Sequence, residues 1–173
     1  MSLNNILLKY HTDKATRHSY APVYERFFEP IKNNNLIFLE IGIFNGGSIR
    51  AWREYFKNAQ IIGVDTKEEY VRKVSDVECT ALLCDINDTK LFSDLTKGLV
   101  FDIIIDDGSH KLDDQLHALN LLIPRLRSGG LYFIEDLQDI DYVKKFNEFK
   151  IELFDLRNLK NRYDDLLLRI EKS

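Results

Sequence analysis

Residues 36–48 read LIFLEIGIFNGGS, an apolar segment that leads into an acid, three glycines and a serine. The apolar part is typical of a buried strand, and the pattern from Ser48 to Phe56 indicates a helix. In open α/β sheets, a strand, a glycine-rich turn and a helix form the cradle that holds a nucleotide-like cofactor. The pattern here is E-x-G-x-x-x-G-G, not the dinucleotide pattern G-x-G-x-x-G. The stretch therefore predicts an α/β fold with a cofactor that lacks a pyrophosphate.

Downstream of this stretch, strand-like and helix-like segments alternate. The runs at 103–105 and 131–134 are apolar throughout, as expected for parallel strands that helices cover on both faces. Leucines from Leu112 to Leu126 recur at helical spacing, and residues 128–130 (Ser-Gly-Gly) are expected to end that helix. The predicted strands are Leu36–Ile41, Ile61–Val64, Ala81–Cys84, Phe101–Ile105, Leu131–Ile134, Lys150–Leu156 and Leu166–Ile170.

Only residues 158–163 separate the last two predicted strands, which is too short for a crossover helix. We therefore expect these two strands to form an antiparallel hairpin at one edge of the sheet. The chain as a whole is predicted to be an α/β protein with a Rossmann-like, seven-stranded and mostly parallel sheet. Helices are expected on both faces of that sheet.

Residues 1–35 have a different pattern from the rest of the chain. Apolar residues from Leu3 to Tyr10 and from Tyr20 to Phe28 indicate two short helices, the second of which is closed by Pro30. A polar stretch lies between these helices and precedes the first strand. We expect it to fold back over the carboxyl end of that strand as a lid. The prediction is one domain, in which residues 1–35 form a helical lid segment and residues 36–173 form the α/β unit.

The composition is that of an ordinary globular domain, with 45% hydrophobic and 30% charged residues. A net charge of -4 argues against a nucleic-acid partner, whose phosphates call for a basic surface. No apolar run approaches the roughly 20 residues of a membrane span, and no secretory signal precedes Leu3. Cys79 and Cys84 lack a metal-type spacing to histidines. We expect both to be reduced packing residues of a cytoplasmic protein with no membrane partner.

Acids and glycines recur at the ends of three successive predicted strands. Asp65 ends the second strand 25 residues after Glu40, where this type of fold places the acid that binds a ribose. Seven strands, a terminal hairpin and E-x-G-x-x-x-G-G together resemble the class I S-adenosylmethionine-dependent methyltransferases. The resemblance implies that Glu40 lies near the cationic end of S-adenosylmethionine, while Asp85 and Ile86 contact the adenine. The full set of implied cofactor residues is Lys14, Glu40, Gly42, Gly46, Ser48, Asp65, Asp85, Ile86 and Asp106. The alternative is that the glycines only make a tight turn and that Glu40 pairs with a lysine.

A second group of acids follows the fourth and fifth predicted strands, where residues 106–110 read DDGSH and residues 135–136 read ED. These strands should be neighbours, so their acids should converge at a cost in free energy unless a cation binds. Oxygen ligands suit a hard divalent ion, most simply Mg²⁺, which lowers the pKa of a bound hydroxyl. Imidazole, with an unperturbed pKa of about 6.5, suits general-base catalysis, so His110 is the candidate base. The alternative is that Ser109 or Asp107 caps a helix that begins near Lys111, which leaves His110 exposed.

The same cluster shows a narrower resemblance. Asp107-Gly-Ser-His110, with Glu135-Asp136 beginning 28 residues after Asp107, resembles the metal-dependent sugar O-methyltransferases of macrolide antibiotic pathways, the mycinamicin type. It is more distantly similar to the cephalosporin hydroxylase family, and the likeness spans roughly residues 10–140. The resemblance implies that Asp107, Glu135 and Asp136 hold Mg²⁺. It also implies that His110 acts as the catalytic base beside Asp107.

Several functions fit these residues. The first is an S-adenosylmethionine- and Mg²⁺-dependent O-methyltransferase for a hydroxyl of a sugar or sugar-bearing small molecule, with acceptor contacts from another subunit if the chain forms a homo-oligomer. The second keeps the cofactor and methylates a catechol-like or other vicinal diol. The third is a non-catalytic subunit that binds S-adenosylmethionine. A nicotinamide-dependent oxidoreductase is disfavoured, because the first glycine turn lacks the pyrophosphate pattern.

Overall fold

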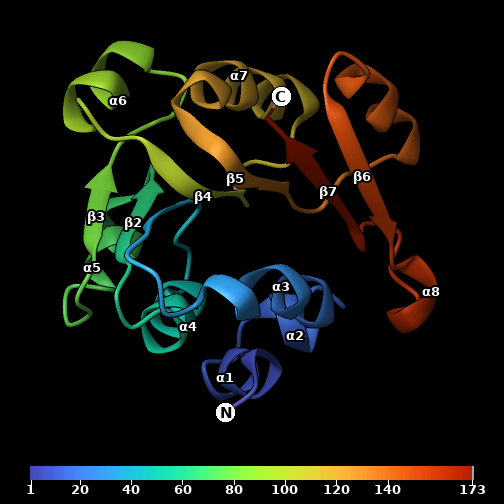
Figure 1. The fold of residues 1–173 in the computed structure, drawn as a ribbon, viewed down its shortest axis with the longest axis horizontal. Coiled ribbons are helices and arrows are strands. Elements are labelled where there is room, and N and C mark those ends of the chain that lie inside the picture. The colour runs from blue at the N-terminus through green and yellow to red at the C-terminus, as the bar shows by residue number, and fades with distance from the viewer. Residues whose placement is uncertain (173) are drawn as a thin grey trace.

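A seven-stranded sheet forms the centre of the molecule in the computed structural model, which describes residues 1–172 (Figure 1). Its strands are β1 (Ile37–Ile41), β2 (Gln60–Asp65), β3 (Thr80–Leu83), β4 (Phe101–Asp106), β5 (Leu126–Ile134), β6 (Lys150–Asp155) and β7 (Leu166–Glu171). They lie in the order β3-β2-β1-β4-β5-β7-β6. Strands β1 to β5 are parallel to one another, and β7 is antiparallel to both β5 and β6. The order reverses between β1 and β4, which is where open α/β sheets bind their ligands.

The predicted fold class is confirmed: the sheet is mostly parallel, and its last two strands form an antiparallel hairpin at one edge. Six of the seven strands begin and end within one residue of the predicted bounds. Cys79 and Cys84 are free thiols, as expected. The exception among the strands is β5, which begins at Leu126 and not at Leu131.

The prediction that residues 128–130 end the preceding helix is wrong. The helix α7 (Leu112–Leu122) is followed by the 3₁₀ turn η2 (Ile123–Arg125), and the chain is extended from Leu126 onward. Pro124 has no N–H group with which to continue the helical hydrogen bonds, so the helix ends earlier than the leucine spacing indicates. Leu126 already pairs with β4, and the register shifts in the part of β5 that contains the glycines. The glycines therefore form an irregularity within the strand.

Helices cover both faces of the sheet (Figure 1). The first face carries α1 (Leu3–Lys9), α2 (Asp13–Thr16), α3 (Ala21–Phe28) with the 3₁₀ turn η1 (Glu29–Ile31), α4 (Gly47–Tyr55) and α5 (Glu68–Arg72). The second face carries α6 (Thr89–Leu95), α7 and the 3₁₀ segment η3 (Ile140–Phe146), while α8 (Arg157–Lys160) lies between β6 and β7. In β4, Ile103 and Ile105 pack on the first face and Ile104 on the second, which explains the unbroken apolar run. No helix among residues 1–172 is long and apolar enough to cross a membrane.

The N-terminal helices are part of the core on the first face. Tyr24 and Phe28 lie one turn apart on α3, and both are fully buried. Their rings stack with centroids 5.1 Å apart, and both meet Trp52 of α4 and Phe133 of β5 edge to face. Such aromatic pairs contribute about 0.5–1.5 kcal/mol each beyond their buried area. The segment predicted as a lid is therefore packed closed against the α/β unit, and its opening and the division at residue 35 stay predictions.

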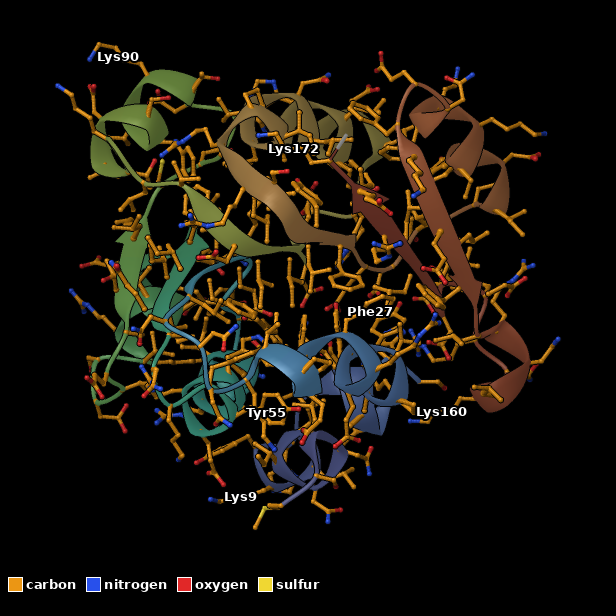
Figure 2. All side chains as sticks on the ribbon, in the orientation of Figure 1. Lys9, Phe27, Tyr55, Lys90, Lys160 and Lys172 are labelled. Carbon is orange, nitrogen blue, oxygen red and sulfur yellow. The ribbon has the colours of Figure 1, made fainter. Side chains whose placement is uncertain are left out.

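The connection between β6 and β7 holds the N-terminal segment from a second side. Lys160 on α8 donates hydrogen bonds to the carbonyl groups of Ala15 and His18 (2.5 and 2.6 Å; Figure 2). Just before β7, Asp165 accepts a hydrogen bond from the backbone N–H of Ser19 (3.0 Å). The N-terminal segment and the connection between β6 and β7 thus meet at the carboxyl edge of the sheet, beside β5.

Candidate active site

The backbone after β1 leaves space at the carboxyl edge of the sheet. Gly42 has φ +98°, and a Cβ atom there would lie 2.1 Å from the carbonyl oxygen of Asp107. A side chain is excluded both by this contact and by the positive φ, so glycine is required. Gly46, at φ +76°, is the N-cap of α4 and completes the turn. A cavity of about 730 Å³ opens beside this turn.

Asp65, at the end of β2, fixes the glycine turn from the side. Its Oδ2 atom accepts hydrogen bonds from the N–H groups of Ile43 (2.9 Å) and Phe44 (3.1 Å). Its Oδ1 atom accepts one from the N–H group of Lys67 (3.0 Å). The carboxylate also lines the cavity. Each carboxylate oxygen has two lone pairs, so Asp65 retains the capacity to accept hydrogen bonds from a ligand hydroxyl.

The predicted cofactor residues divide into two groups. Those that line the cavity are Gly42, Asp65, Asp85, Ile86 and Asp106. Lys14, Glu40 and Ser48 are instead buried in a polar network behind the turn. Ser48 donates a hydrogen bond to Glu40 (2.8 Å), and Lys14 Nζ lies 3.3 Å from the same carboxylate. Glu40 thus pairs with a lysine, as one alternative from the sequence held, while Gly46 shapes the turn.

One side of the cavity is aromatic, which was not predicted from the sequence. Phe44 is 58% exposed at the tip of the glycine turn, and its ring contacts Tyr70 of α5 edge to face at 5.2 Å. Both side chains line the cavity, together with Lys67. The sequence signal for Phe44 is its position as an aromatic residue inside a glycine-rich turn. Tyr70 lies outside every motif, and its role follows only from the fold.

A fully buried lysine joins the acids that sequence analysis grouped together. Lys14 is 0% exposed, and its Nζ atom lies 2.6 Å from Asp107 and 2.9 Å from Glu135. Burial by itself lowers the pKa of Lys14, but the carboxylates of Asp107, Glu135 and Glu40 outweigh it, so the pKa is well above its ordinary value. Lys14 is therefore an ammonium ion that links the ends of β1, β4 and β5. The acidic motifs contain no cation, so the pairing of Lys14 with Asp107 and Glu135 was not predicted from them.

Two buried tyrosines of the N-terminal segment orient the acids after β5. Tyr20 donates a hydrogen bond to Asp136 Oδ1 (2.6 Å), and Tyr24 donates one to Glu135 Oε1 (2.5 Å). Burial and then the neighbouring carboxylates raise the pKa of both phenols well above the ordinary value. Both hydroxyl groups therefore stay protonated and act as donors. Tyr20 thus binds one oxygen of Asp136, whereas Glu135 is bound at both oxygens, by Tyr24 and by Lys14.

His110 faces the same acids from the loop after β4. Its Nε2 atom lies 4.0 Å from Asp107 Oδ1 and 3.9 Å from Asp136 Oδ2, and its side chain is 31% exposed. His110 and Asp136 both have positive φ, +59° and +54°, which costs roughly 1–3 kcal/mol for a residue with a side chain. The structure agrees only in part with the alternative of a helix cap. Ser109 accepts a hydrogen bond from the N–H of Lys111. Within residues 1–172, however, the side chain of the N-cap residue of α7 makes no capping hydrogen bond.

The geometry identifies two groups that can each hold a cation. Ligand atoms of Asp107, His110 and Asp136 lie within 4.8 Å of one another, and those of His18, Asp136 and Asp164 meet the same condition. Two of the three predicted metal ligands, Asp107 and Asp136, belong to the first group. Glu135 is next to it and is bound by Lys14 and Tyr24. The three predicted metal ligands thus lie at one edge of the sheet, and the ammonium group of Lys14 lies between two of them.

Buried acids at this edge predict a pH-dependent stability. Burial raises the pKa of Asp106 to about 7, against about 3.9 in an unfolded chain. A raised pKa means that the folded chain is favoured while the acid is protonated, and that this stability is lost as the pH rises through 7. Relative to the wild type, Asp106→Asn should therefore gain about 2–3 kcal/mol of stability between pH 5 and pH 7.5. Urea unfolding in chelator at both pH values measures this gain.

The matched control is Asp94→Asn, which changes an aspartate whose side chain is 63% exposed on α6. Its stability relative to the wild type should not change between the two pH values. An Asp106→Asn variant that behaves like this control would show that Asp106 is already ionised at pH 5 in the folded chain.

The fold and the cavity at the carboxyl edge define a class I methyltransferase fold, and the sequence comparison agrees. Residues 39–137, more than half of the chain, match a family model described as a methyltransferase domain. The chain therefore belongs to this methyltransferase family.

Similar proteins of known name are sugar-modifying O-methyltransferases. The chain is 34% identical over 144 residues to 8-demethyl-8-alpha-L-rhamnosyl tetracenomycin-C 2'-O-methyltransferase of Streptomyces olivaceus (79% of this chain, 38% of the relative). It is 35% identical to demethylmacrocin O-methyltransferase of Streptomyces fradiae (78% and 36%) and 33% identical to mycinamicin VI 2''-O-methyltransferase of Micromonospora griseorubida (78% and 36%). The chain spans little more than a third of the length of these relatives.

Solved structures give the same relationship. One is the MycE methyltransferase of the mycinamycin biosynthetic pathway, in complex with Mg, SAH and mycinamycin VI. Its TM-score with this chain is 0.80 at 25% identity, and the match covers all of this chain and 55% of the MycE chain. A second crystal form with Mg and SAH has a TM-score of 0.83 at 24% identity, covering 100% of this chain and 54% of its own. The resemblance to the mycinamicin type that the motifs indicated is thus confirmed.

Proposed function

We propose that this chain is an S-adenosylmethionine- and Mg²⁺-dependent O-methyltransferase that acts on a hydroxyl of a sugar or of a sugar-bearing small molecule. The names of the relatives support this acceptor class, and the MycE complex holds Mg, SAH and mycinamycin VI. The observation in this chain that carries the proposal is that two sets of predicted site residues line one cavity. Asp107 and His110 line the same cavity as Asp65 and Asp85, so an acid–histidine group lies beside a nucleoside-sized space.

The donor set at this edge fits a hard divalent cation. Asp107, Glu135 and Asp136 offer carboxylate oxygens from two neighbouring strand ends, and Asp136 Oδ2 is left free by Tyr20, which binds Oδ1. Mg²⁺ prefers such oxygen ligands and keeps open positions for substrate oxygens. When bound by these acids it would polarise the acceptor hydroxyl, and S-adenosylmethionine would supply the electrophilic methyl group.

His110 is the group in the cavity that can take the proton of the acceptor hydroxyl. Its distances of 3.9 and 4.0 Å to Asp136 and Asp107 are longer than hydrogen bonds, so Nε2 is not committed to either carboxylate. The same carboxylates would stabilise the imidazolium that forms once the proton has moved. Lys14, Tyr20 and Tyr24 are bonded to the acids and do not themselves line the cavity.

Two alternatives follow from the same site. A catechol-like acceptor or another vicinal diol would meet the same groups, and an acceptor panel that includes free sugars and catechols separates the two substrate classes. A non-catalytic subunit would bind S-adenosylmethionine and transfer no methyl group to any acceptor. We further propose a cytoplasmic enzyme with a small-molecule or saccharide acceptor, without nucleic-acid or membrane partners, and with another subunit of a homo-oligomer completing the acceptor site.

Methyl transfer should require a divalent ion. Excess chelator should abolish transfer, and added Mg²⁺ should restore it. Asp107→Asn should reduce the rate at least about 100-fold at saturating S-adenosylmethionine, because the acceptor hydroxyl then loses its Lewis acid. Transfer of labelled methyl groups to the acceptor measures both effects. Asp102→Asn, which removes a partner of Arg127 at the opposite end of β4, is the matched control. Full activity in chelator would contradict the metal requirement.

Asp65 should contribute to cofactor binding. Asp65→Ala should weaken the binding of S-adenosylmethionine by roughly 1–3 kcal/mol, the effect of losing hydrogen bonds to a charged group. Calorimetry measures the affinity directly. Asp76→Ala, at an exposed aspartate that pairs with Arg50, is the control and should bind as the wild type does. An unchanged affinity in Asp65→Ala would remove this residue from the ribose position.

A further inference from the structure

A buried cluster around His18 is not used by the reaction proposed above. His18 is 3% exposed and lies between two carboxylates: its Nε2 atom is 3.4 Å from Asp136 Oδ2, and its Nδ1 atom is 3.5 Å from Asp165 Oδ1. Asp164, which is 6% exposed, brings a third carboxylate. Ligand atoms of His18, Asp136 and Asp164 lie within 4.8 Å of one another.

Several polar atoms of this cluster lack a partner. Across residues 1–172, the buried atoms without a hydrogen-bond partner include His18 Nδ1, Asp164 Oδ1 and Asp165 Oδ2. Each such atom costs about 1–3 kcal/mol, and folded proteins leave few of them. The distances of 3.4 and 3.5 Å between His18 and its two acids also exceed those of good hydrogen bonds. The cluster therefore offers several lone pairs that can bind one shared partner.

The carboxyl groups of the cluster indicate that this partner is a divalent cation. Those of Asp136, Asp164 and Asp165 meet in a buried space, and Arg162 is bonded to Asp164 at 2.8 Å. Buried carboxyl oxygens without a partner are costly. A divalent cation can bind oxygens of several carboxylates at once, which a single hydrogen-bond donor cannot do.

His18 is held rigidly for such a role. Its ring stacks on Tyr20 with centroids 4.8 Å apart, and Lys160 binds its carbonyl group. Tyr20 also occupies Asp136 Oδ1, so that Oδ2 is the oxygen left for a cation. Pre-organised ligands of this kind are what a specific metal site requires.

We propose that His18, Asp136 and Asp164 form a second divalent-cation site, which takes a first-row transition metal such as Zn²⁺. An imidazole nitrogen with carboxylate oxygens suits such metals, whereas an oxygen-only ligand set suits Mg²⁺. Asp136 is shared with the site of Asp107, so the two cations would be neighbours. This proposal does not rest on methyl transfer, because it stands on the packing and charge of the cluster itself.

The test measures Zn²⁺ binding to the full chain in excess Mg²⁺, which fills the oxygen-only site. Calorimetry and metal analysis after dialysis should both give one Zn²⁺ per chain. Asp164→Asn should weaken this binding at least about ten-fold, because a carboxylate ligand is lost. Asp94→Asn on the surface of α6 and His110→Asn in the neighbouring group should both bind Zn²⁺ as the wild type does. No stoichiometric Zn²⁺, or equal binding by Asp164→Asn, would overturn the proposal and leave His18 as a counter-ion.

A second measurement needs no variant at the site. The chain has four histidines, whose ring nitrogens can be followed by NMR in the wild type. The signals of His18, assigned by single replacement of each of the other three, should shift when Zn²⁺ is added in excess Mg²⁺. A shift confined to His110 would place the zinc in the first group and refute the second site. Methyl transfer, assayed separately, reports on the proposed function and can fail or succeed independently.

Discussion

His110→Ala should reduce turnover by about 10²–10⁴-fold, which is the usual contribution of general acid–base catalysis. A sugar hydroxyl attacks the methyl group of a sulfonium poorly until its proton is leaving, and His110 is the candidate base in the cavity beside Asp107 and Asp136. The affinity for S-adenosylmethionine should change little, because Asp65 and Asp85, which are predicted to bind the cofactor, lie on other strand ends. Turnover at saturating substrates, with calorimetry of cofactor binding, separates the two effects.

The backbone at His110 requires a second variant. With φ at +59°, alanine is strained there, whereas asparagine tolerates this conformation. His110→Asn should therefore be as inactive as His110→Ala but closer to the wild type in stability. Added imidazole should restore part of the turnover of His110→Ala, while His117→Ala, at a half-buried histidine on α7, should be fully active. A His110→Ala enzyme that keeps most of its turnover would mean that the cation alone activates the hydroxyl, or that His18 takes the proton.

Lys14→Met should reduce the free energy of unfolding by about 3–5 kcal/mol, the effect of breaking a buried ion pair by removing one partner. Methionine matches the length of the lysine stem but leaves the carboxylates of Asp107 and Glu135 without their ammonium ion. Uncompensated charge in a buried site is far more costly than a lost surface contact. Urea unfolding in the presence of chelator measures the difference.

Lys9→Met is the matched control. Lys9 also forms an ion pair, with Glu54 at 2.5 Å, but its side chain is 51% exposed, and Figure 2 shows it at the outer edge of the N-terminal helices. Exposed pairs contribute about 0–1 kcal/mol, so this variant should be nearly as stable as the wild type. Added Mg²⁺ should restore part of the stability of Lys14→Met, because a cation then compensates the same acids. Equal stability of the two variants would show that the acids near Lys14 are protonated and need no counter-ion.

Much of the fold could be predicted because its signals are local. The parallel strands β1 and β4 are buried on both faces, so consecutive residues are apolar at 37–39 and at 103–105, and the strands end where acids and glycines follow. The start of β5 could not be predicted in this way. Leucine spacing continued the helix to Leu126, while Pro124 ended it earlier, and pairing with β4 made the glycines part of a strand. Tertiary pairing there outweighed local propensity.

The candidate site was predictable only in its strand-end parts. Asp65, Asp107 and Asp136 lie in motifs that parallel topology brings to one edge, and the sequence placed them there. Their partners come from distant segments without a motif of their own: Lys14 bonds to Asp107 across 93 residues and Tyr20 to Asp136 across 116. No periodicity encodes such pairs. The cation within the acidic group and the cluster around His18 therefore emerge only once the chain is folded.

The contact between the N-terminal segment and the β6–β7 connection has a consequence for biosynthesis. Ser19 is bonded to Asp165, 146 residues further along, and α8 holds the same segment through Lys160. During translation the first helices emerge long before these partners exist, and contacts so distant in sequence form slowly. The segment that carries Lys14 and Tyr20 would therefore lack its contacts with Lys160 and Asp165 until the β6–β7 hairpin leaves the ribosome. A nascent chain stalled before residue 160 would thus carry the methyltransferase motifs without these contacts.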